Sequence, residues 1–144
     1  MSMTLVEISH DSEAYRQECE LRHRVLRKPL GLSLYDEDLS DECRHLHFGC
    51  FDCNNLLGCA IAVPASQSEA RIRQMAVEPH ARRNGLGRLL LSFVETRLKA
   101  DGFLHVALHA RIESVGFYKK SGYAVLSSQF VEVGIPHVLM RKTL

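Results

Sequence analysis

The sequence has no tryptophan, only four prolines and almost no net charge: +1 over 144 residues, with its eight histidines counted as neutral. So small a charge creates no field that would attract nucleic acid or an anionic membrane, and neither is expected as a partner. No apolar run approaches the roughly 18 residues of a membrane helix, and the N-terminal MSMTLVEISH has no basic stretch leading into an apolar core. A cytoplasmic location is therefore expected.

The five cysteines are an odd number in a chain without a secretion signal, which favours reduced thiols over a disulfide framework. Cys50 and Cys53 form a CxxC pair, but a zinc site needs about four ligands and only His45 or His47 stands close enough in sequence to help. The pair is better explained as two small residues at the end of a hairpin. No metal is expected.

The composition, 46% hydrophobic and 24% charged residues, is that of a globular chain with a core. The sequence contains no internal repeat, low-complexity tract or linker rich in proline, glycine or serine. Its length suits one domain. These features predict a single domain over residues 1–144.

Hydrophobic periodicity predicts a mixed series of strands and helices. A polar, acidic loop is expected at 33–44, and turn-forming residues at 52–55 predict a hairpin. Together they indicate an α+β (mixed α/β) domain with helices on both faces of one sheet. The expected strands are 4–9, 45–51, 56–63, 71–77, 105–112, 123–126 and 136–140, and the expected helices are 13–27, 86–99 and 113–120.

The segment ARRNGLGRLLL, residues 81–91, lies where a strand should run into a helix. The free N–H groups and positive dipole end of a helix N-terminus attract anions, and Gly85 and Gly87 would allow a ligand to approach the backbone closely. Arg82, Arg83 and Arg88 add positive charge. The segment lacks the Lys-Ser/Thr of a P-loop and the third glycine of GxGxxG. Local features alone leave phosphate binding and a plain glycine turn equally open.

Two motifs resemble the GNAT superfamily of N-acetyltransferases. Arg82-x-x-Gly85-x-Gly87, between MAVEP and LLLSFVE, is similar to that family's acetyl-CoA pyrophosphate motif. ARIESVGFYKKSGY, residues 110–123, is similar to the family's strand-helix-strand segment with its FYxxxGF-like pattern. LRHRVLRKPLGL and VGIPHVLMRK extend the resemblance toward both ends. It implies a central, mostly antiparallel sheet whose two middle strands, 71–77 and 105–111, splay apart.

The resemblance also implies acetyl-CoA as co-substrate. The backbone of Met75, Ala76 and Val77 would hydrogen-bond the pantetheine arm, and an N–H near Ala76 would polarise the thioester carbonyl. The pyrophosphate would lie on the loop and first helical turn, formed by Arg82, Arg83, Asn84, Gly85, Leu86, Gly87 and Arg88.

By the same resemblance, a primary amine of a small molecule or a protein lysine attacks the acetyl carbonyl directly in a ternary complex and expels the CoA thiolate. Tyr118, in the FY pair, corresponds to the family's proton donor to sulfur. The alternative is that Tyr118 only packs its ring beside Phe117. The segment departs from the family where Glu113 and Ser114 replace a common asparagine.

The general base is not defined by a motif. Many members carry a glutamate on the strand before the glycine loop, where this chain has Arg71, Arg73 and Gln74. His47 and His109 are the first candidates, because imidazole titrates near neutral pH and their strands should border the cleft. The remaining candidates are Glu132, His137 and a water chain with no dedicated base.

Other readings stay open. The same fold could serve as a non-catalytic CoA-sensing or partner-binding module, since the family's glutamate is missing. The acidic run at 36–42 could attract a cationic amine or be a solvated loop, and Arg22, Arg24 and Arg27 could recognise an acceptor carboxylate or phosphate or decorate an exposed helix face. The apolar C-terminal PHVLMRKTL suggests a homodimer, because pairing would cover an exposed strand edge.

Overall fold

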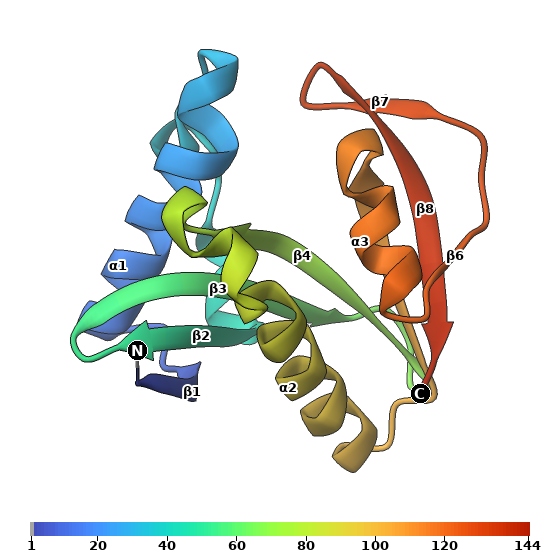
Figure 1. The fold of residues 1–144 in the computed structure, drawn as a ribbon, viewed down its shortest axis with the longest axis horizontal. Helices are drawn as coiled ribbons and strands as arrows, with labels where there is room; N and C mark the ends of the chain where they lie inside the picture. The colour runs from blue at the N-terminus through green and yellow to red at the C-terminus, as the bar shows by residue number, and fades with distance from the viewer. Residues whose placement is uncertain (1) are drawn as a thin grey trace.

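A computed structural model describes residues 2–144 and shows one eight-stranded sheet with helices on both faces (Figure 1). The strand order is β1-β2-β3-β4-β5-β8-β6, and β7 also pairs with β8. Neighbouring strands are antiparallel except β4 and β5, which run parallel. The strands are β1 (Met3–Ile8), β2 (Leu46–Asp52), β3 (Asn55–Pro64), β4 (Glu69–Val77), β5 (His105–Arg111), β6 (Ala124–Val125), β7 (Phe130–Glu132) and β8 (Ile135–Thr143). The predicted mixed α/β class and mostly antiparallel sheet are confirmed.

The first helix, α1 (Glu13–Arg22), begins at Ser12, whose Oγ accepts a hydrogen bond from the N–H of Tyr15 at 3.2 Å. It continues as a π-helical turn at His23–Arg27 and a 3-10 turn at Lys28–Leu30, and ends at Gly31, whose φ is 73°. The predicted helix over 13–27 is therefore present, with its last turn widened.

The two faces of the sheet carry different helices. On one face α2 (Leu86–Ala100) buries a stripe of leucines and Val94 against the main core, and α3 (Val115–Lys120) packs Phe117 and Tyr118 against the same core. On the other face Leu21 of α1 joins a smaller cluster with Ile8 and Leu56. The helix predicted from the amphipathic pattern of 86–99 is thus confirmed, and its apolar face is buried. None of the helices in the described part of the chain is both long and apolar enough to cross a membrane.

Strand β7 is absent from the expected elements. It pairs with β8 through a tight turn in which Val133 and Gly134 both have positive φ, 46° and 79°. A turn of this kind normally carries glycine, asparagine or aspartate at both central positions, and a β-branched valine is disfavoured there. The sequence signal for this hairpin was therefore incomplete. The predicted strand at 136–140 is confirmed but too short, because β8 runs from Ile135 to Thr143.

The expectation of an exposed C-terminal strand edge is wrong. β8 pairs with β5 along one side, and β6 and β7 occupy the two ends of its other side. A second copy of the chain therefore has little free edge of β8 to pair with, and the argument for a homodimer through PHVLMRKTL loses its basis.

Candidate functional site

The cavity of this fold opens where β4 and β5 separate. The two strands pair from Glu69–His105 to Ile72–Leu108, and both continue beyond that point without pairing. Figure 1 shows the two halves of the sheet diverging from this junction. A cavity of about 610 Å³ fills the gap, lined by β4, β5, α3, the end of the first helix and the β7–β8 turn.

A bulge in β4 shapes one wall of this cavity. The register with β3 shifts between Cys59 and Ile61, and Gln74 has a φ of 54°, which is rare for a residue with a side chain. Beyond Ile72 the edge of β4 that faces β5 has no strand partner within residues 2–144. Backbone N–H and C=O groups on this edge of residues 73–77 are therefore available to a ligand, except the Val77 carbonyl, which accepts a hydrogen bond from Arg82.

The glycine segment lies next to this edge. A 3-10 turn (Pro79–Asn84) leads to Gly85, whose φ is 72°, and α2 begins at the next residue without a side-chain cap. Arg82 folds back and donates from Nε to the carbonyl of Val77 at 3.1 Å. A Cβ on Gly87 would lie 3.3 Å from the ring of Phe117, so α2 and α3 pack closely at this position, where both residues line the cavity. The first N–H groups of α2 therefore have no side-chain partner, and a helix end of this kind attracts anions.

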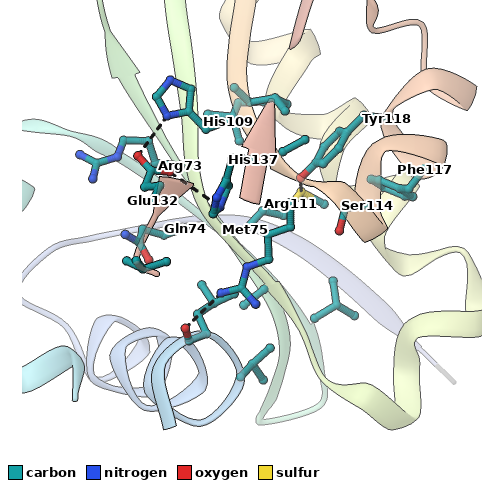
Figure 2. Close-up of a pocket in the computed structure, with 18 of the residues that line it drawn as sticks. Arg73, Gln74, Met75, His109, Arg111, Ser114, Phe117, Tyr118, Glu132 and His137 are labelled. Atoms are coloured by element: carbon teal, nitrogen blue, oxygen red, sulfur yellow. Dashed lines mark hydrogen bonds and ion pairs between the residues drawn. The ribbon is translucent and has the colours of Figure 1, made fainter. Parts of the chain in front are cut away.

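Tyr118 projects from α3 toward the bulge. Its hydroxyl lies 3.6 Å from Sδ of Met75, and burial raises the pKa of Tyr118 to about 12 (Figure 2). The phenol therefore keeps its proton at neutral pH. A protonated hydroxyl in a cavity is a potential proton donor.

The opposite end of the cavity holds a group of titratable side chains around Glu132. His109 Nδ1 lies 3.1 Å from Glu132 Oε1, and His137 Nε2 lies 3.8 Å from Oε2 (Figure 2). Arg71 Nη2 also contacts His109 Nδ1 and is 3.6 Å from Glu132. Burial raises the pKa of Glu132, but His109, His137 and Arg71 more than offset this, so the pKa lies below its usual value. Glu132 is therefore a carboxylate held between two histidines and an arginine.

Comparison with known proteins identifies the family of this fold. The model of the acetyltransferase (GNAT) domain matches residues 17–144. The chain belongs to the GNAT acetyltransferase family. The Bacillus subtilis protein YyaT, which is uncharacterised, is 32% identical over 106 residues, 74% of this chain and 70% of YyaT.

Solved structures show the same GNAT fold. Escherichia coli ElaA has a TM-score of 0.83 at 20% identity, covering 98% of this chain and 99% of ElaA. A GNAT family acetyltransferase from Elizabethkingia anophelis, solved with acetyl-CoA bound, has a TM-score of 0.73 at 19% identity over 99% and 98% of the two chains. At these identities the likeness concerns the fold.

The residues predicted to bind the cofactor fall into two groups in this GNAT domain. Met75, Ala76, Val77, Arg82 and Gly87 line the cavity. Arg83, Asn84, Gly85 and Arg88 are exposed beside it, and the side chain of Leu86 is buried in a core cluster, so Leu86 offers only its backbone. The residues of the second group can contact only the part of a ligand that extends out of the cavity.

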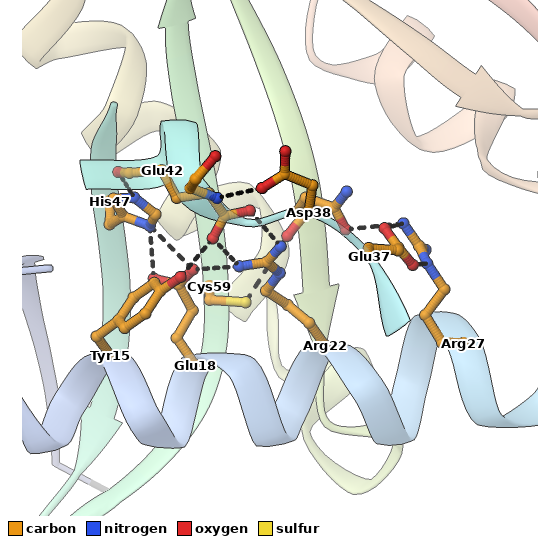
Figure 3. A network of polar contacts seen from close by, with 11 residues as sticks. Tyr15, Glu18, Arg22, Arg27, Glu37, Asp38, Glu42, His47 and Cys59 are labelled. Atoms are coloured by element: carbon orange, nitrogen blue, oxygen red, sulfur yellow. Dashed lines mark hydrogen bonds and ion pairs between the residues drawn. The ribbon is translucent and has the colours of Figure 1, made fainter. Parts of the chain in front are cut away.

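The expectation that His47 borders the cleft is wrong. β2 is separated from β5 by β3 and β4, and His47 is 1% exposed and absent from the cavity lining. Its Nδ1 contacts Glu18 at 2.9 Å, and its Nε2–H donates to the Glu42 carbonyl at 2.8 Å (Figure 3). Burial lowers the pKa of His47, but the Glu18 carboxylate more than compensates and the pKa is raised. His47 is therefore a structural side chain.

The carboxylates around His47 could be mistaken for a metal site, because ligand atoms of Glu18, Glu42 and His47 lie within 4.8 Å of one another. However, Arg22 donates to Glu18 at 3.0 Å and to both oxygens of Glu42 at 2.8 and 2.7 Å. Its guanidinium already supplies the positive charge that a metal ion would bring.

The two cysteines of the CxxC pair lie in different surroundings, because Cys50 is buried and Cys53 is exposed.

One cavity residue has no counterpart among the sequence candidates. Arg111 extends from the end of β5 across the cavity and donates from Nη2 to the carbonyl of Leu26 at 3.1 Å (Figure 2). Leu26 belongs to the π-helical turn on the opposite wall. The signal was present in the alternation of His109 and Arg111, which places both side chains on one face of β5.

Proposed function

We propose that this GNAT domain transfers the acetyl group of acetyl-CoA to a primary amine of a small molecule or protein lysine, by direct attack in a ternary complex. The splayed β4–β5 junction carries the proposal, because it joins a free strand edge and an uncapped helix end to a group of titratable side chains in one cavity. Acetyl-CoA as donor is supported by GNAT structures with the same fold that hold acetyl-CoA or coenzyme A.

Donor binding follows from the free backbone groups. The unpaired edge at Met75, Ala76 and Val77 would hydrogen-bond the pantetheine arm as an added strand does. The N–H groups at the start of α2, with the neighbouring arginines, would hold the pyrophosphate. An N–H fixed near the bulge would stabilise the negative charge that develops on the thioester oxygen.

Proton transfers complete the reaction. The attacking amine must lose a proton as its nitrogen bonds to the acetyl carbon, and the C–S bond then breaks with the electron pair on sulfur. We assign Tyr118 as the acid that protonates this thiolate, because its hydroxyl lies in the cavity at the bulge and keeps its proton at neutral pH.

We assign His109 as the base, with Glu132 as its positioning residue. Nδ1 of His109 cannot accept from Arg71 and donate to Glu132 at once, so these two partners select opposite tautomers. When Nδ1–H donates to Glu132, Nε2 is free to accept the amine proton, and the carboxylate stabilises the imidazolium that forms.

Replacing Glu132 by glutamine is expected to lower kcat/KM for the amine about tenfold or more, and His109→Gln about 100-fold. In both variants the acidic limb of the pH profile should move to higher pH, because only amine that is already neutral in solution then reacts. Initial rates over a pH series measure this. Unchanged rates and pH profiles would instead favour a water chain with no dedicated base.

Coenzyme A binding should be blocked at Gly87. A valine there would meet the Phe117 ring and fill the part of the cavity that these two residues line. We expect the dissociation constant of this variant for coenzyme A, measured by calorimetry, to rise at least about tenfold. Gly116→Val is the matched control, because a Cβ on Gly116 meets nothing within 4 Å. Equal affinity in wild type and Gly87→Val would contradict this placement.

Initial-rate kinetics test the reaction order. Direct attack predicts intersecting double-reciprocal lines when acetyl-CoA and amine are varied, since both must be bound together. Parallel lines would indicate an acetyl-enzyme intermediate and would overturn the ternary-complex mechanism. Tight coenzyme A binding with no transfer to any amine would favour the non-catalytic module.

A further inference from the structure

We propose that the acceptor is an amine that also carries an anionic group, a carboxylate or a phosphate, and that Arg111 binds this group with the help of Arg73. This rests on the proposed acetyl transfer and narrows it to one class of acceptor. The observation behind it is uncompensated positive charge in the cavity.

The charged side chains that line the cavity do not balance. They comprise five arginines and three glutamates. Arg27 pairs with Glu37 at 2.6 Å, and Arg71 lies 3.6 Å from Glu132. Arg82 stands beside the helix end assigned to the pyrophosphate. Arg73 and Arg111 remain with Glu113, and neither arginine forms an ion pair with it or with any other of the residues described.

Arg111 is the better placed of the two. It is partly buried, and its one hydrogen bond, to the Leu26 carbonyl, uses only Nη2. Burial lowers the pKa of Arg111; Glu113 opposes this, whereas Arg27 and Arg82 add to it. A guanidinium in these surroundings gains from an anion, which it can bind through two parallel N–H groups.

The position of Arg111 relative to His109 favours the acceptor as the source of that anion. Both side chains lie on the same face of β5, two residues apart, so an anion on Arg111 lies on the side of the proposed base. Arg73 flanks this region from β4, at the first position beyond the last β4–β5 pair. If Arg111 binds the anion of the acceptor, a short linker between that anion and the amine would place the amine beside His109.

Matched acceptor pairs test the proposal. Each pair shares an amine and differs in the anion: an α-amino acid against its decarboxylated amine, and glucosamine 6-phosphate against glucosamine. For at least one pair the anionic member should have a kcat/KM about 10- to 100-fold higher. In Arg111→Gln this preference should fall at least about tenfold through a higher KM for the anionic member, with the neutral member and the coenzyme A affinity unchanged. Arg73→Gln should show a smaller change in the same direction.

Exposed Arg44, which lies outside the cavity, provides the control variant Arg44→Gln, and it should keep the wild-type preference. Preference for the neutral or cationic member in every pair would overturn the proposal. So would an Arg111→Gln variant that loses coenzyme A affinity instead, because Arg111 would then belong to the donor site.

A binding measurement separates this proposal from the proposed acetyl transfer. Calorimetry on the coenzyme A-saturated protein, with the N-acetylated products of the same pairs, needs no turnover. Tighter binding of the anionic products, lost in Arg111→Gln, supports the anion site even if no amine is acetylated. Equal binding of both products overturns it even if acetyl transfer is observed.

Discussion

Replacing Tyr118 by phenylalanine is expected to lower kcat by about 10²- to 10⁴-fold and to leave the coenzyme A dissociation constant within about twofold. The variant keeps the ring that packs in the cavity and removes only the hydroxyl beside Met75. Because burial raises the pKa of Tyr118 to about 12, the acid keeps its proton across the neutral range. Wild-type activity should therefore show no loss from Tyr118 ionisation until the pH approaches 12. Thiol release and calorimetry measure the two quantities.

Tyr123 offers a matched control for this result. It is a buried tyrosine outside the cavity, and its hydroxyl donates to Glu95 at 2.7 Å. Tyr123→Phe should cost some stability and preserve kcat. If Tyr118→Phe kept the wild-type kcat, Tyr118 would be a packing residue and the thiolate would leave without it.

The largest loss of stability is expected at Arg22. Its side chain is fully buried, and its guanidinium is the cation between the carboxylates of Glu18 and Glu42. Arg22→Met would leave those carboxylates buried with only His47 and Tyr15 as partners, at a cost of about 3 to 5 kcal/mol of unfolding free energy. Urea denaturation at neutral pH measures the change.

Removing the charge on both sides gives the control. Arg22→Met combined with Glu18→Gln and Glu42→Gln should recover part of the loss, because no unpaired buried charge remains. A loss below about 1 kcal/mol in the single variant would contradict the role given to Arg22.

Acid should weaken the same network. Burial raises the pKa of Glu42, but Arg22, Tyr15 and His47 more than offset this and lower it. A carboxyl whose folded-state pKa is lowered contributes stability above its unfolded-state pKa and loses it as the pH falls through the folded-state value. The contribution of Glu42 is thus complete at neutral pH and is lost in acid.

The sequence predicted those parts of the site that depend on local chemistry. The glycine segment at 81–91 begins α2 with a left-handed Gly85, and Tyr118 lies on α3 as the FY pattern indicated. Both features are set by residues close together in the chain, whose backbone preferences and helix pattern can be read directly.

The parts that were missed depend on contacts between distant segments. His47 and His109 stand on similar short strands, and only the sheet order places one two strands from the cleft and the other inside it. The bulge in β4 has Gln74, not glycine, at its positive-φ position, so no residue type in the sequence indicates it. The β7–β8 turn, which brings Glu132 to His109, has Val133 where a turn residue is expected, so it was not predicted. Register and strand order follow from packing of the whole sheet, which a local pattern does not encode.

The proposed reaction of this chain is the transfer of an acetyl group from acetyl-CoA to an amine. The most direct measurement is the amount of thiol released by the wild-type protein, compared with the amount of acetylated amine found by mass spectrometry, over the matched acceptor pairs. We expect one acetylated amine for each thiol released, and no thiol release in the absence of the amine. Coenzyme A binding without acetylated product from any amine, or thiol release that is independent of the amine, would contradict it.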